Sequence, residues 1–140
     1  MKQPLIYFGS WLFLIMFFLT SCAKDDPTPS PTDPRANFIG SWNVNENWTK
    51  LTFEVTITAD ANSSNGVVLD DFAGSGTGIK THAIVSGNGI VISPLPQALS
   101  NGWVIQSGSG ALQGTSTINW GYVFSDQANQ YTAVAVFTKN

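Results

Sequence analysis

The chain has 140 residues, enough for one modest hydrophobic core, and its formal net charge at pH 7 is −3. From residue 36 onward, three lysines stand against six carboxylates, so the chain lacks the basic patch with which nucleic-acid-binding proteins neutralise phosphates. The polar residues there are mainly Ser, Thr, Asn, Gln and Gly, which is typical of extracytoplasmic β-proteins and unlike helical or disordered chains.

The first 21 residues predict a secretory signal peptide. Lys2 supplies the positive start, an apolar run covers residues 5–19, and small residues precede Cys22. The apolar run has about 15 residues, which is short of the roughly 20 that a helix needs to cross a bilayer. We therefore expect residues 1–21 to form a signal-peptide helix that is removed and takes no part in the fold.

Cys22 is the only cysteine, so no disulfide can form within the chain. The tetrad Leu19-Thr20-Ser21-Cys22 resembles the lipobox of bacterial lipoproteins. This resemblance implies that Cys22 is the lipid attachment site and the first residue of the mature protein. Two or three acyl chains make a stable anchor, so the expected partner of the chain is a membrane that it is attached to and does not span.

The residues after Cys22 predict a tether over 22–36. The segment 23–26, Ala-Lys-Asp-Asp, resembles the export signal of surface-displayed lipoproteins in the Bacteroidota. It implies a location in the outer membrane, facing the exterior, with retention on the inner leaflet as the alternative. Four prolines in residues 27–34 then favour an extended polyproline-like spacer.

From residue 37 to residue 140, apolar residues recur with a period of two, which indicates β-strands. In the clearest case, Leu51, Phe53, Val55 and Ile57 share one predicted face. The Asn-Gly pair at 65–66 then predicts a hairpin into an apolar run over 67–72.

The middle of this region predicts a second hairpin. Residues 79–86 alternate, a Gly-Asn-Gly turn follows at 87–89, and residues 90–92 form the partner strand. The glycine-rich run 74–78 precedes a strand and no helix, so it is interpreted as a hairpin connection and not as a phosphate-binding loop. Two prolines make 93–101 a connection, with one helical turn expected around 97–99.

The last part of the chain predicts strands over 103–106, 111–113, 117–124 and 131–138, with Gly108-Ser109-Gly110 interpreted as a flexible turn. One face of the strand 117–124 carries Ile118, Trp120, Tyr122 and Phe124. The expected fold is therefore all-β, an antiparallel up-and-down meander of about seven or eight strands. A barrel is favoured because the hairpins are sequential, and a β-sandwich is the alternative.

The segment Gly40-Ser41-Trp42 resembles the Gly-x-Trp start of lipocalin-like (calycin) barrels. The resemblance implies that Trp42 closes one end of the barrel beneath Gly40. In that family an arginine on a late strand often packs on the tryptophan, whereas this chain has no arginine after Arg35. The whole layout resembles small lipocalin-like lipoproteins of the Bacteroidota.

Residues with catalytic or ligating chemistry are scarce between residues 37 and 140. His82 is the only histidine and no cysteine is present, so a zinc site lacks ligands. There is no Gly-x-Ser-x-Gly nucleophile elbow, and the adjacent Asp70 and Asp71 point to opposite faces of a strand. We therefore expect no enzyme activity, no cofactor and no metal.

Aromatic residues are the one feature that suggests a binding role. Packing in the core and at the barrel ends can account for them. The functional alternative is that Trp103, Trp120 and Tyr122 line a mouth or groove that binds a small apolar or sugar-like ligand or a partner protein. Two hypotheses follow: a membrane-anchored, surface-exposed binding protein, or a structural or interaction protein of the cell envelope with a filled core and no pocket.

Overall fold

Strands with alternating inward and outward side chains make up most of the computed structural model, which describes residues 32–140. Within these residues, the strands are β1 (Gly40–Glu46), β2 (Thr52–Ala59), β3 (Gly66–Asp70), β4 (Lys80–Ser86), β5 (Gly89–Ile92), β6 (Gln97–Ala98), β7 (Val104–Gln113), β8 (Thr117–Ser125) and β9 (Gln130–Lys139). Two short 3₁₀ turns are η1 (Phe72–Gly74) and η2 (Ser100–Gly102). No helix in this part of the chain is long and apolar enough to span a membrane.

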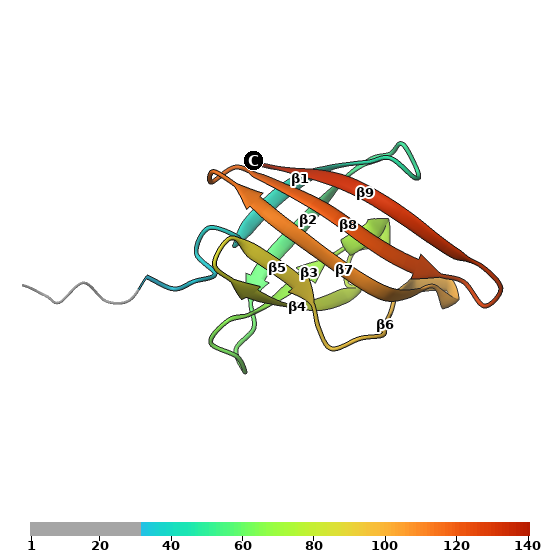
Figure 1. The fold of residues 1–140 in the computed structure, drawn as a ribbon, viewed down its shortest axis with the longest axis horizontal. Helices are drawn as coiled ribbons and strands as arrows, with labels where there is room; N and C mark the ends of the chain where they lie inside the picture. Colours follow the sequence, from blue (N-terminus) through green and yellow to red (C-terminus); the bar gives the residue numbers. More distant parts are fainter. Residues whose placement is uncertain (1–31) are drawn as a thin grey trace, which may run out of the picture. The chain divides into compact units, whose positions relative to one another are not determined.

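Eight of these strands close into an antiparallel up-and-down barrel (Figure 1). Strand β1 pairs with both β2 and β9, and the barrel closes where β5 pairs with β7, at Gly89–Val91 against Ser109–Ala111. The two-residue β6 pairs only with β7. The predicted barrel is confirmed, and the sandwich alternative is not the fold that the chain adopts.

The alternating strand directions give the barrel two distinct ends, which we call the base and the mouth (Figure 1). The described chain enters at the base and β1 runs from there to the mouth. The base carries the turns 60–65, 87–88 and 114–116, and the mouth carries the loops 47–51, 71–79, 93–103 and 126–129. The expected signal peptide (1–21), Cys22 and the tether as far as residue 31 lie outside the described residues.

The core lies inside the barrel, where the inward side chains of all eight strands meet. On β8, Ile118, Trp120, Tyr122 and Phe124 are all buried, as the sequence predicts. The neighbouring β9 contributes mainly small residues between its ends, so large side chains from β8 face space left by small ones. This pairing of large and small side chains fills the barrel centre.

Trp42 lies at the base and is completely buried. Its indole Nε1 donates a hydrogen bond to the carbonyl of Phe38, at 2.8 Å, and the ammonium of Lys139 lies 5.2 Å from the ring centroid. A cation on the last strand therefore covers the tryptophan, although this cation is a lysine and the chain has no arginine after Arg35. Gly-x-Trp thus stands at a closed barrel end, in the position that the lipocalin resemblance implies.

Arg35 attaches the entering chain to the base. Its guanidinium Nη1 donates to the backbone carbonyls of Asp60, Ser63 and Gly66, at 3.1, 2.8 and 3.3 Å. The same guanidinium pairs with Asp33 and lowers the pKa of that carboxyl to about 2 through their hydrogen bonds. Arg35 lies in the segment expected as a tether, and these contacts make it part of the barrel base.

Strand β7 corrects the prediction of two short strands separated by a flexible turn. It runs unbroken from Val104 to Gln113, and a bulge between Ile105 and Ser107 turns Gly108 and Gly110 inward. Their partners across the ladder are Tyr122 and Trp120. A Cβ on Gly110 would lie 2.9 Å from Trp120, so these glycines are present because the aromatic side chains of β8 occupy their space.

Two smaller predictions near the mouth are also wrong. Leu51 precedes β2 and is 63% exposed, because the strand begins only at Thr52, after a left-handed residue at Lys50. The helical turn expected around 97–99 is instead strand β6, followed by η2. The Gln97 side chain bonds to the backbone N–H and C=O of His82, at 2.7 and 2.8 Å, and so holds this segment against β4.

Candidate functional site: a pocket at the barrel mouth

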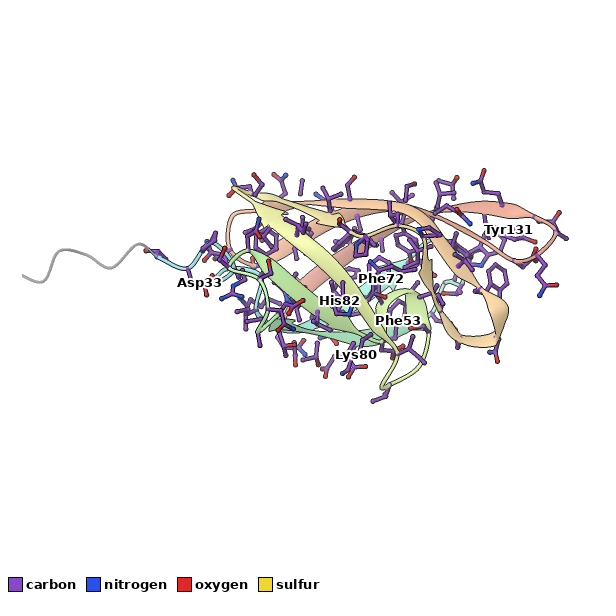
Figure 2. The ribbon with its side chains drawn as sticks, turned by 90° about the horizontal axis from the view of Figure 1, so that it is seen from below. Asp33, Phe53, Phe72, Lys80, His82 and Tyr131 are labelled. Carbon is purple, nitrogen blue, oxygen red and sulfur yellow. The ribbon has the colours of Figure 1, made fainter. Side chains whose placement is uncertain are left out.

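Phe72, which belongs to the mouth loop 71–79, lies inside the barrel (Figure 2). Turn η1 folds this side chain inward, where it is fully buried against Trp120 and Tyr122, with ring centroids 5.1 and 4.9 Å away. Asp71 accepts a hydrogen bond from the N–H of Gly76, and Asp70 accepts one from Gly78. The adjacent aspartates therefore brace the loop that carries Phe72.

A cavity of about 250 Å³ lies at the mouth, beside η1, and we call it the mouth pocket. Three loops and the ends of β1 and β8 form its walls. Its lining residues include Glu46, Trp48, Ser75, Ser100, Trp103 and Phe124. The pocket therefore combines aromatic rings with a carboxylate and hydroxyl groups.

Four aromatic rings, Trp48, Trp103, Phe124 and Tyr131, pack together in what we call the aromatic cluster, and the first three of them line the mouth pocket. Trp48 lies 4.6 Å from Tyr131 and Trp103 lies 5.2 Å from Phe124, measured between ring centroids. Phe124 and Tyr131 stack on each other at 5.7 Å. Figure 2 shows Tyr131 at the end of the barrel away from Asp33, which places the cluster at the mouth.

Backbone contacts hold both tryptophans in place. Asn47 exchanges two hydrogen bonds with the backbone of Val134 on β9, at 3.0 and 2.8 Å, and so fixes the loop that carries Trp48. The N–H of Leu99 donates to the carbonyl of Trp103, at 2.7 Å, across the tight turn η2. Trp48 is 47% exposed, so part of its ring is open to a ligand.

Glu46 is the one carboxylate that points into the barrel among the described residues. It ends the inward row Trp42, Val44, Glu46 on β1 and is only 2% exposed. Its Oε2 accepts hydrogen bonds from the hydroxyl and the N–H of Thr49, at 2.9 and 3.4 Å. Burial raises the pKa of this carboxyl above its ordinary value, and the bonds from Thr49 oppose that shift.

Four buried polar atoms in the described chain have no hydrogen-bond partner within it. They are the hydroxyl oxygens of Ser75, Thr81 and Tyr122 and the indole nitrogen of Trp120. Of these residues, Ser75 lines the mouth pocket. Because a buried polar group without a partner is costly, a hydrogen bond between this hydroxyl and a bound ligand would be favourable.

The structure separates the three aromatic residues selected from the sequence. Trp103 lies on the wall of the mouth pocket, whereas Trp120 and Tyr122 are 1% and 2% exposed and pack against Phe72 deeper in the barrel. Cys22 lies outside the described residues. The ligand-binding role suggested for the three aromatic residues stays a prediction.

Sequence reasoning did not identify Glu46 or Ser75 as site residues. The sequence pattern could have marked Glu46 as unusual, because it occupies an inward position of a strand whose other inward residues are apolar. No sequence pattern could have marked Ser75, since its burial depends on how η1 folds into the mouth. Between residues 32 and 140, no group of three or more His, Cys, Asp or Glu side chains is placed to hold a metal ion.

A second, shallow groove of about 620 Å³ lies on the outer face of β1, β8 and β9. The asparagines 43, 45 and 119 line it beside two exposed apolar residues, Val134 and Val136, which are 56% and 44% exposed. No charged residue lines this groove, and its one aromatic lining residue, Trp120, is only 1% exposed, so the groove offers fewer specific contacts than the mouth pocket.

Comparison with known proteins assigns no family to this chain. No protein-family model matches the sequence, and no curated protein matches it.

Proposed function

We propose that this protein is a binding protein that takes a small ligand at the mouth of its barrel. The observation that carries the proposal is the mouth pocket itself, where the half-exposed ring of Trp48 and the ring of Trp103 stand beside the buried Glu46 and Ser75. Ligand sites in proteins are concave and mostly apolar, with a few placed polar groups. An eight-stranded barrel is just wide enough for side chains to fill it or for one small ligand, and here the space for a ligand lies at the mouth.

The same proposal includes attachment to a membrane. The lipobox-like tetrad that ends at Cys22, the Lys-Asp-Asp segment after it and the Gly-x-Trp start of the barrel support a lipocalin-like lipoprotein of the kind found in the Bacteroidota. The described chain enters at the base through Arg35, at the end away from the pocket. A lipid anchor before residue 32 would therefore leave the mouth free to meet ligands outside the outer membrane.

Blocking the pocket tests the binding function. Ser100 lines the pocket, and Ser100→Phe places a ring in it, whereas Ser116→Phe makes the same change at an exposed position of a base turn. Full-length protein in a neutral detergent is titrated with benzyl alcohol, benzylamine, methyl glucoside and octanoate while tryptophan fluorescence is recorded. We expect a saturable response to at least one probe that Ser100→Phe removes and Ser116→Phe preserves. No saturable response, or one unchanged by Ser100→Phe, would overturn the proposal.

The membrane attachment has its own test. Protein extracted from the membranes of producing bacteria is weighed by intact mass spectrometry, alongside Cys22→Ala, and whole cells are treated with protease. A chain that begins at Cys22 with added acyl groups, and a barrel lost on protease treatment, are the expected results. An uncleaved and unlipidated chain contradicts the anchor, and a protected barrel contradicts the surface location.

An interaction protein of the cell envelope is the second candidate, because the outer groove exposes Val134 and Val136 side by side with asparagines. Single exposed apolar residues are ordinary, but a pair in a groove can contact a partner. If Val134→Ser abolishes capture of a crosslinked partner on cells and Ser100→Phe does not, this candidate replaces the pocket proposal.

A further inference from the structure

We infer that the ligand of the mouth pocket is a small organic cation, an ammonium group carried on a compact apolar or aromatic body. This inference rests on the proposed binding function and names the chemical class of its ligand.

Glu46 is a buried carboxylate without a counter-charge from the described chain. The ion pairs between residues 32 and 140 join Arg35 to Asp33, Lys80 to Asp70 and His82 to Asp60. Lys50 is close in sequence, but it is exposed and makes no ion pair with Glu46. Hydrogen bonds to Glu46 reach only Oε2, and Oε1 accepts none from the described residues.

A buried carboxylate is costly unless a cation or hydrogen-bond donors compensate it. Thr49 satisfies one oxygen, so the other is left to a group that enters the pocket. An ammonium ion supplies both the missing charge and the missing donor, whereas a neutral hydroxyl supplies only a donor and an anion is repelled. The carboxylate therefore selects a cation over neutral and anionic ligands of the same shape.

The aromatic residues of the pocket favour the same ligand. Trp48, Trp103 and Phe124 line it, and the negative face of an aromatic ring, of tryptophan most of all, attracts a cation within about 6 Å of its centroid. The barrel makes this kind of contact once already, at the base, where Lys139 covers Trp42. The Ser75 hydroxyl, buried and without a partner in the described chain, provides a further acceptor for an ammonium N–H.

The size of the pocket limits the body of the ligand. A volume of about 250 Å³ corresponds to about eight water molecules at roughly 30 Å³ each. Phe72 closes the barrel centre beneath it, so a long acyl chain has no channel to enter. A single small ring or a short branched chain, with its ammonium group at Glu46, fits these limits.

The test compares benzylamine, which is cationic at neutral pH, with its neutral analogue benzyl alcohol and with the anion benzoate. Each is titrated into the full-length protein in neutral detergent, in the wild type, in Glu46→Gln and in Glu54→Gln, which makes the same change on an exposed carboxylate of β2. We expect the wild type to bind benzylamine about tenfold more tightly than benzyl alcohol and to reject benzoate. Glu46→Gln reduces benzylamine binding to the level of benzyl alcohol, and Glu54→Gln changes neither.

Failure of the inference and failure of the binding function give different results. If benzyl alcohol or methyl glucoside binds in a way that Ser100→Phe blocks, and benzylamine binds no better than benzyl alcohol, the pocket is a ligand site but not a cation site. If no probe binds, both the cation inference and the pocket proposal are overturned. Binding of benzyl alcohol by Glu46→Gln reports that this variant keeps a folded pocket.

Discussion

Glu46 is a residue whose burial opposes the stability of the fold at the place where we propose a ligand site. Its carboxylate is buried at the end of β1, and burial raises its pKa. A native state that favours the neutral form loses stability when the group must ionise. Under the proposed function, this loss of stability accompanies the placement of a carboxylate in the ligand site.

The pH dependence of the free energy of unfolding measures whether Glu46 stabilises or destabilises the barrel. Because the pKa of Glu46 is higher in the folded barrel than in the unfolded chain, the stability that its protonated form provides is lost as pH rises through the folded pKa. Urea unfolding followed across this range is therefore expected to show Glu46→Gln gaining stability relative to the wild type as pH increases. A difference between the two proteins that does not depend on pH would contradict the raised pKa.

Asp126 provides a control of opposite sign. Hydrogen bonds from the N–H groups of Ala128 and Asn129 lower the pKa of its carboxyl. The stability from this group is present above the unfolded pKa and is lost as pH falls through the folded one. Asp126→Asn should therefore differ most from the wild type at neutral pH, and the difference should shrink in acid.

At the scale of single elements, β7 and β8 depend on each other. Gly110 on β7 faces Trp120 on β8, and the side chains of Ile90 and Ile118 also reach into the space where a Cβ of Gly110 would lie. The bulge between Ile105 and Ser107 brings the glycines to this inward position. The strand therefore remains continuous through a Gly-Ser-Gly segment that, taken alone, resembles a turn.

A matched pair of glycine substitutions tests this dependence. Gly110→Ala adds a methyl group 2.9 Å from three side chains, so we expect a loss of about 1–3 kcal/mol in the free energy of unfolding through overpacking. Gly121→Ala on β8 places the same methyl in open space and should be neutral or slightly stabilising. Equal effects of the two substitutions in denaturant unfolding would argue against the tight β7–β8 packing.

For the whole molecule, the short pairing of β5 with β7 decides whether the sheet closes. Only three residue pairs join these strands, from Gly89 to Val91. Ile90 is fully buried at this seam, whereas its neighbour Val91 is 50% exposed. Closure therefore depends on the apolar contacts inside the barrel as well as on the few backbone hydrogen bonds of the seam.

Substitutions at the seam measure how strongly closure is coupled to the rest of the barrel. Ile90→Ala should lower the free energy of unfolding by about 2–5 kcal/mol, because it leaves a cavity in the shared core. Val91→Ala, on the outer face of the same seam, should stay within about 0.5 kcal/mol. Tryptophan fluorescence and circular dichroism should report one coincident transition, and two separate transitions would mean that the seam opens independently.

The local pattern of the sequence was sufficient for much of the fold. The period-two alternation in β2, β4 and β8 depends only on neighbours along the chain, and it correctly predicted the strands and the inward face of β8. Sequential turns favoured an up-and-down barrel, which the structure confirms. The Gly-x-Trp motif correctly located one closed end, with Trp42 inside it.

The mouth could not be predicted in the same way, because its residues come from loops that are far apart in the chain. Whether Phe72 enters the barrel, and which residues then meet beside it, depends on the space left by β8 and β9. A Gly-Ser-Gly segment is a turn or a strand according to what lies opposite it.

The sequence by itself therefore determined most of the strands and their up-and-down order, because strand periodicity and turn chemistry are local. Only the tertiary structure decided the continuity of β7, the seam between β5 and β7, and the pocket that brings Glu46 near Trp48 and Trp103. These features arise from the volumes and charges of side chains that meet only after the barrel has closed.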